Sequence, residues 1–223
     1  MLNGALNKAV RDGLIPGNPM KQLDKREKFQ PSPEEREFLT IDEVRTLMET
    51  PCTNEQVKKA FLLSCFVGLR LGDVRELTWA KVMNTPDGNT QYVHVWMEKT
   101  QKPINVPLSN EALRYMEKKE DPDAKLFKLP TSDATINYHI KKWMKAAKID
   151  KKISYHCSRH TFATIMLTLG ADLFTTSKLL GHANVTTTQI YGKIIDKKTE
   201  AVNLVDNLFT PKAELNDEDR TEA

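Results

Sequence analysis

Four short segments of the sequence contain residues that could act together on one substrate. They are residues 68–73 (Gly-Leu-Arg-Leu-Gly-Asp), 98–100 (Glu-Lys-Thr), 156–160 (His-Cys-Ser-Arg-His) and 180–182 (Leu-Gly-His), the last followed nine residues later by Tyr191. A guanidinium group can donate two parallel hydrogen bonds to a phosphate, and two such groups stabilise the negative charge that develops when a phosphodiester is attacked. Arg70 and Arg159 are suited to this task.

The other polar residues of these segments could supply a nucleophile and move protons. A tyrosine hydroxyl has an ordinary pKa near ~10, so Tyr191 would need a neighbouring base or a strong field. We expect His156 to accept its proton, and His182 to hold the phosphate or order the site. Lys99 could protonate the departing oxygen, although Lys102 lies on the same expected turn and a slip of register would exchange the two.

In this order and spacing, the four segments resemble the catalytic domain of the tyrosine recombinase (phage integrase) family, over about residues 38–193. The combination of His-x-x-Arg-His, Leu-Gly-His and a tyrosine nine residues further on is a specific pattern. The resemblance implies a site-specific DNA recombinase or integrase that cleaves and rejoins DNA through a 3′-phosphotyrosyl intermediate, with no cofactor and no metal. It assigns catalytic roles to Arg70, Lys99, His156, Arg159, His182 and Tyr191, and supporting roles to Asp73 and His160.

The resemblance leaves the biological role open. Integration or excision of a mobile element is the preferred interpretation, while Xer-like chromosome dimer resolution and type IB topoisomerase activity share the same chemistry. The partners that the resemblance implies are double-stranded DNA, further copies of the chain in a homotetramer on synapsed DNA, and accessory DNA-bending proteins. The free protein is expected to associate weakly or to be monomeric. An apolar stretch at 202–209 could dock on a neighbouring copy.

Two interpretations without strand cleavage start from the same segments. Helices expected at 156–169 and 173–180 are joined by a short glycine-containing turn, which is typical of a non-catalytic helix-turn-helix DNA-binding module. His156 and His160 are four residues apart, so a zinc ion could bind them together with His182 or Cys157, although the glutamate of the HExxH motif is missing. Tyr191 could be a core aromatic residue, but its sequence neighbours are polar.

The periodicity of apolar residues predicts a mainly α-helical fold with a small antiparallel β-sheet (α+β), and the resemblance implies the tyrosine recombinase catalytic-domain fold. Thr40 and Glu43 form a capping box before a helix at 41–49, and a second helix follows at 55–68. Alternating residues predict strands at 92–97 and 104–108 around a turn at 100–103, with a third strand at 77–83. Further helices are expected at about 136–147, 162–170 and 172–181, and residues 186–208 look helical but broken.

Composition and charge divide the chain into four parts. We expect the last helix of a truncated core-binding domain at 1–19, a linker at 20–37, the catalytic domain at 38–210 and an acidic disordered tail at 211–223. The net charge is 33 − 30 = +3, and residues 214–223 carry −4, so the remainder carries +7, as a phosphate-binding surface would. No apolar run is long enough to cross a bilayer, and three cysteines without a CxxC spacing favour a reducing compartment. We therefore expect a cytoplasmic protein with no membrane partner.

Overall fold

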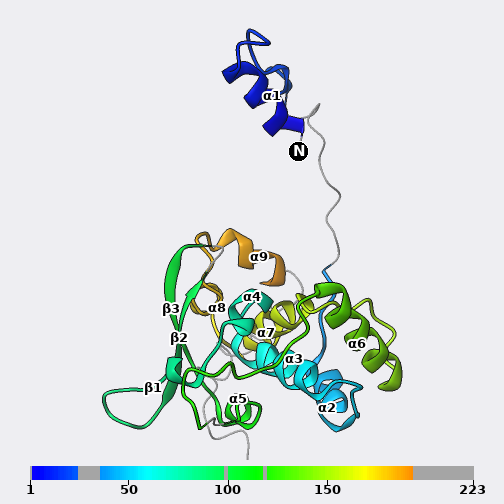
Figure 1. Ribbon diagram of the computed structural model, residues 1–223, viewed down its shortest axis with the longest axis vertical. Coiled ribbons are helices and arrows are strands. Elements are labelled where there is room, and N and C mark those ends of the chain that lie inside the picture. The colour runs from blue at the N-terminus through cyan, green and yellow to red at the C-terminus, as the bar shows by residue number, and fades with distance from the viewer. Residues whose placement is uncertain (1, 25–35, 98–99, 118–119, 193–223) are drawn as a thin grey trace, which may run out of the picture. The chain divides into compact units, whose positions relative to one another are not determined.

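The computed structural model describes residues 2–24, 36–97, 100–117 and 120–192, and the chain divides into two compact units, Met1–Arg36 and Glu37–Ala223. Figure 1 shows the helices and strands of each unit. Within the described ranges, no helix is both long enough and apolar enough to cross a lipid bilayer.

The first unit contains helix α1 (Leu2–Arg11) and a short 3₁₀ helix, η1 (Pro19–Lys21). Asn18 connects the two, because its side-chain amide donates hydrogen bonds to Asn3 Oδ1 and Asn7 Oδ1, both at 2.7 Å. No residue of α1 is buried, and Leu2 is exposed. So short a helix with an uncovered apolar face is marginal by itself. The assignment of α1 to a core-binding domain stays a prediction.

The second unit is mainly α-helical with one small antiparallel sheet, which confirms the predicted fold class. Its α-helices are α2 (Ile41–Glu49), α3 (Glu55–Val67), α4 (Leu71–Arg75), α5 (Asn110–Arg114), α6 (Asp133–Ala146), α7 (Cys157–Thr168), α8 (Leu173–Leu179) and α9 (Thr186–Gly192). Helices α3 and α7 pack against each other, with α2 and α6 on one side of them and the sheet on the other (Figure 1). The predicted capping box is present: the Thr40 and Glu43 side chains each accept a hydrogen bond from the other's backbone amide.

The main core lies between α3, α6 and the segment that precedes α7. The Phe61 ring from α3 meets Trp143 and Tyr155 edge to face, with 5.9 and 5.8 Å between ring centroids. The buried Tyr155 hydroxyl also donates a hydrogen bond to Ala60 O, at 2.8 Å. Because Tyr155 is held by both its ring and its hydroxyl, it fixes the backbone immediately before His156.

The sheet has three antiparallel strands in the order β1 (Val82–Asn84), β2 (Gln91–Met97) and β3 (Lys102–Pro107). The predicted alternation is confirmed in β2, where Val93, Val95 and Met97 are buried. The predicted strand at 77–83 is wrong in its first half. Residues 77–78 pair instead with residues 125–126, and Trp79–Lys81 form a 3₁₀ helix, so only 82–84 remain to pair with β2. Strand β3 begins at Lys102, two residues before the predicted start of that strand.

Gly68 ends α3 with a left-handed backbone, φ +68°, directly against Phe162 of α7. A Cβ atom at this position would lie 2.5 Å from Phe162 Cδ1. We expect Gly68→Ala to lower the free energy of unfolding by about 2–4 kcal/mol, from left-handed strain together with overpacking. Gly88→Ala is the matched control in a urea titration: its φ is +71° but nothing lies within 4 Å, so only about 1–2 kcal/mol should be lost. Equal losses of stability in the two variants would contradict the steric argument.

Candidate active site

Arg70 and Asp73 are placed by the turn that ends α3. Gly68 takes the left-handed conformation, and Arg70, half-buried, is then the N-cap residue of α4. Asp73 is buried in the first turn of α4, and its Oδ2 atom has no hydrogen-bond partner among the described residues. Burial lowers the pKa of the Arg70 guanidinium, and the negative charge of Asp73 raises it. The expected supporting acid therefore lies close to Arg70.

Arg159 comes from the first turn of α7 and is only 3% exposed. Its guanidinium donates one hydrogen bond to Gly68 O at the end of α3 and another to Leu180 O at the end of α8. Burial lowers the pKa of Arg159, the charge of Arg70 lowers it further, and Tyr191 and Asp73 raise it. Since two guanidiniums share one low-dielectric region, binding an anion such as a phosphate would stabilise this part of the site.

Arg70, His156 and Arg159 line a single pocket of about 270 Å³, which we call the arginine pocket. Asn137 of α6 and Ser154 also line it. His156 is exposed, whereas Arg159 is buried beneath the surface. The structure thus brings together three of the predicted site residues, which come from two segments far apart in the sequence.

Tyr191 lies on α9 and is 2% exposed, in a small apolar cluster that includes Phe162 and Leu180. Its hydroxyl makes a hydrogen bond with His160 Nδ1. The His160 ring in turn meets the His156 ring edge to face, with 4.7 Å between centroids and an interplanar angle of 89°. A series of aromatic side chains therefore leads from the arginine pocket to the phenol, although Tyr191 itself does not line that pocket.

Gly181 follows the end of α8 with a left-handed backbone, φ +60°, and His182 comes directly after it. His182 Nδ1 lies 2.8 Å from Thr188 Oγ1, a buried hydroxyl on α9. Thr188 precedes Tyr191 by three residues, so the two share a face of the helix. The sequence interpretation did not single out Thr188, although this spacing was the signal that could have found it. His182 therefore connects the end of α8 to the helix that carries the phenol.

The predicted hairpin lysine, Lys99, lies outside the described residues. Lys102, its alternative, is exposed. It is the first residue of β3 and pairs with Met97, the last residue of β2. Met97 is buried, and its Sδ atom lies 3.9 Å from Arg70 Nη1. It also packs against Gly181, where an added Cβ would come within 2.3 Å of the same sulfur. The end of β2, two residues before Lys99, is therefore anchored beside the arginine pocket.

The family of the chain follows from its similarity to known proteins. Residues 37–198 match the model of the phage integrase family. The chain belongs to this family, the tyrosine recombinases. This phage integrase family member is 32% identical to the tyrosine recombinase XerA of Thermococcus onnurineus, over 77% of the chain and 64% of that protein.

Two solved structures show the same fold as this phage integrase family member. The catalytic domain of bacteriophage HP1 integrase matches with a TM-score of 0.57 and 23% identity, over 81% of this chain and 98% of that one. XerH bound to its palindromic difH substrate matches with a TM-score of 0.58 and 18% identity, over 77% of this chain and 54% of that one. The chain spans 60% of the length of the tyrosine recombinase of Pseudothermotoga lettingae and 71% of that of the tyrosine recombinase XerD of Pseudomonas putida.

In this phage integrase family member, the Tyr191 hydroxyl is hydrogen-bonded to His160, the histidine for which a supporting role was expected. The sequence predicted His156 as its proton acceptor, but the hydroxyl is hydrogen-bonded to His160, one helical turn further along α7. The expectation that His160 is a buried, hydrogen-bonding residue is confirmed, since it is 7% exposed. Both histidines lie in the same short motif, so spacing alone could not decide which ring faces Tyr191.

The zinc alternative finds no support in the described part of this phage integrase family member. No group of three or more histidine, cysteine, aspartate or glutamate residues there could hold a metal ion. His160 Nδ1 is used by the Tyr191 hydroxyl, and His182 Nδ1 is used by the Thr188 hydroxyl. Two of the histidines that were considered as zinc ligands are thus hydrogen-bonded to side chains of α9.

Proposed function

We propose that the chain cleaves and rejoins double-stranded DNA at defined sites, through a covalent bond between Tyr191 and the 3′ phosphate of the cut strand. The observation that carries the proposal is the convergence of Arg70 and Arg159 on one pocket, to which His156 connects the His160–Tyr191 pair. The fold neighbour XerH was solved with difH DNA, and this substrate class is carried over as part of the proposal.

Strand cleavage would exchange one phosphate ester for another. The Tyr191 oxygen forms a bond to phosphorus while the bond to the 5′ oxygen breaks, so the phosphotyrosyl ester keeps the energy of the linkage and rejoining needs no ATP. Arg70 and Arg159 hold the non-bridging oxygens and supply the positive charge. His160 receives the phenolic proton, and Lys99 protonates the departing 5′ oxygen. The same steps in reverse rejoin the strand.

A nicked suicide duplex tests the proposal, because the short released strand diffuses away and the covalent adduct accumulates. Duplexes are taken from the DNA that flanks the gene, and the adduct is measured on a denaturing gel. We expect the unaltered chain to form the adduct and Arg70→Lys to form it about 10²–10³ times more slowly, because lysine replaces a forked hydrogen-bonding group with a point charge. Arg114→Lys, exposed on α5, is the control. An Arg70→Lys variant as fast as the control would contradict the assigned role of Arg70.

We further propose that the biological role is integration or excision of a mobile element. The 32% identity to XerA favours chromosome dimer resolution as the second candidate. Supercoiled plasmids that carry two copies of either gene-flanking DNA or chromosome-terminus DNA separate the two roles, since deletion between the copies identifies the substrate. Relaxation without deletion would instead indicate a type IB topoisomerase.

The proposed assembly is a homotetramer on two synapsed duplexes, with accessory DNA-bending proteins as further partners and a cytoplasmic location. The stretch 202–209, which could dock on a neighbouring copy, and the acidic tail at 211–223 lie outside the described residues. The alternative of a non-catalytic helix-turn-helix module is not adopted. Its two helices are present as α7 and α8, but α7 also carries Arg159, which lines the arginine pocket, and His160, which is hydrogen-bonded to Tyr191.

A further inference from the structure

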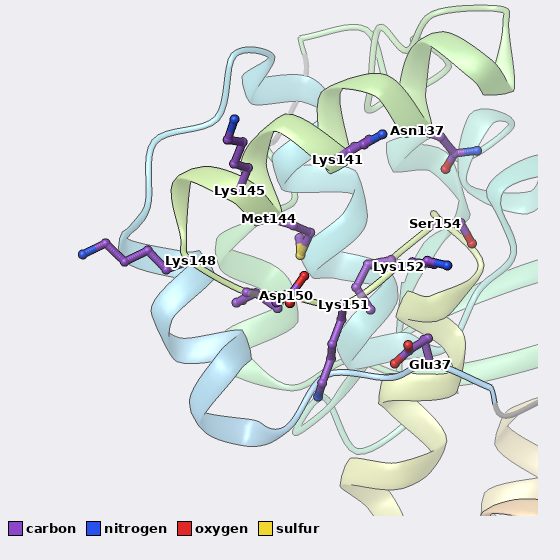
Figure 2. A pocket seen from close by; sticks show the side chains of 12 residues that line it. Glu37, Asn137, Lys141, Met144, Lys145, Lys148, Asp150, Lys151, Lys152 and Ser154 are labelled. Atoms are coloured by element: carbon purple, nitrogen blue, oxygen red, sulfur yellow. The ribbon is translucent and has the colours of Figure 1, made fainter.

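A second and larger hollow, of about 840 Å³, lies beside the arginine pocket and takes no part in the chemistry proposed above. It is formed by the C-terminal half of α6 and the segment 148–154, and five lysines line it: Lys141, Lys145, Lys148, Lys151 and Lys152 (Figure 2). Glu37 and Asp150 are the two carboxylates of the lining, which therefore has a net charge of +3. So concentrated a positive charge favours a polyanionic ligand.

Helix α6 and the residues just after it carry three of these lysines. Lys141 and Lys145 are four residues apart, which puts them on the same face of α6, and Lys148 follows the end of the helix with a left-handed backbone, φ +57°. The opposite face of α6 is held in the core by Ile140 and Trp143. The packing behind α6 therefore holds Lys141 and Lys145 toward solvent.

Lys151 differs from the other four lysines because it is neutralised within the fold. Its Nζ atom lies 2.6 Å from Glu43 Oε2 and donates a hydrogen bond to Phe38 O at 3.1 Å. Among the described residues, no carboxylate forms an ion pair with Lys141, Lys145, Lys148 or Lys152, all of which are exposed. We call these four residues the lysine row.

The lysine row continues directly from the arginine pocket. Asn137 and Ser154 line both hollows, and Figure 2 shows Lys141 and Lys152 pointing toward the end where these two residues lie. Lys145 and Lys148 lie toward the other end. Duplex DNA carries one phosphate per ~3.4 Å along each strand, so a strand with one phosphate in the arginine pocket must bring further phosphates past its rim.

We propose that the lysine row binds the phosphate backbone of duplex DNA beside the cleavage site, without reading its sequence. The inference rests on the proposed function, because the arginine pocket must hold the scissile phosphate for the neighbouring phosphates to reach the row. Lysine ammonium groups are flexible point charges, suited to phosphates and not to the edges of particular bases. The lysine row contributes affinity and position on the DNA, while the arginine pocket performs cleavage.

The test compares the double variant Lys145→Gln/Lys148→Gln with the charge-matched control Arg114→Gln/Lys128→Gln, whose positions line neither hollow. Binding of a labelled duplex to the full chain is followed by fluorescence anisotropy over a series of NaCl concentrations. The slope of log affinity against log salt should become shallower by roughly 1.8 in the double variant, about 0.9 for each phosphate that a lysine no longer neutralises. The control should keep a slope closer to that of the unaltered chain, and duplexes of unrelated sequence should show the same difference.

Cleavage of a suicide substrate at saturating DNA separates this inference from the proposed function. We expect the Lys145→Gln/Lys148→Gln variant to form the covalent adduct at a rate close to that of the unaltered chain. Equal salt slopes for the double variant and the control, in a chain that cleaves DNA, would overturn the inference. So would a lysine-dependent affinity for an acidic peptide, such as residues 214–223, with no change in DNA binding. A lysine-dependent slope in a chain that never forms the adduct would support the row and overturn the proposed cleavage.

Discussion

Tyr191→Phe is expected to abolish the covalent adduct between the chain and a nicked DNA duplex. Phenylalanine keeps the ring that packs between Phe162 and Leu180, but it removes the oxygen that would attack phosphorus. Removal of a nucleophile lowers the rate by a factor on the order of 10⁴ or more, so no adduct should be seen on a denaturing gel. The fold loses the hydrogen bond with His160, at a cost of about 1 kcal/mol.

The matched control for this prediction is Tyr115→Phe. Tyr115 is a half-buried tyrosine at the end of α5, and its ring stacks on Phe66 with 5.9 Å between centroids. The control loses a hydroxyl that does not line the arginine pocket, so it should form the adduct normally. Both variants should bind DNA with the affinity of the unaltered chain. If Tyr191→Phe forms as much adduct as the control, Tyr191 is not the nucleophile.

Local signals in the sequence predicted those features that neighbouring residues decide among themselves. Thr40 and Glu43 form the expected capping box, and the Asp172 side chain caps α8 by accepting from the Thr175 amide at 2.9 Å. Gly68 ends α3 in the left-handed conformation that glycine favours. In each of these cases the interacting residues lie within four positions of each other, so the local sequence pattern nearly determines the contact.

Features that depend on distant packing could not be predicted in this way. The strand expected at 77–83 is shortened because its first residues pair with 125–126, a segment more than forty positions away. His160 and Tyr191 are 31 residues apart, and their hydrogen bond exists because α9 packs on α7. The motif showed which residue types gather at the site. It did not show which of two histidines, one turn apart, faces the phenol.

His160→Asn is expected to slow adduct formation by about 10²–10⁴ near neutral pH, the range that a general base ordinarily contributes. For the phenol to donate to His160 Nδ1, the neutral ring must carry its proton on Nε2, which leaves Nδ1 free to accept. Asparagine can hold the hydroxyl in place near the position of Nδ1, but it cannot take a proton. His160→Ala lacks both abilities. If His160 only positions Tyr191, asparagine should restore most of the rate that alanine loses.

The pH dependence of cleavage distinguishes the base from a neighbour that supports it. Without a base, attack depends on the small fraction of phenolate, which grows about tenfold per pH unit below the ordinary phenol pKa of ~10. The log rate of His160→Asn should therefore rise with pH at a slope near one, while the unaltered chain levels off once the histidine is neutral. His156→Asn should be slower than the unaltered chain but keep its levelling profile, because His156 contacts His160 and the arginine pocket. The opposite pattern, with the rising profile in His156→Asn, would return the role of base to His156 and make the observed bond to His160 a resting contact of the phenol.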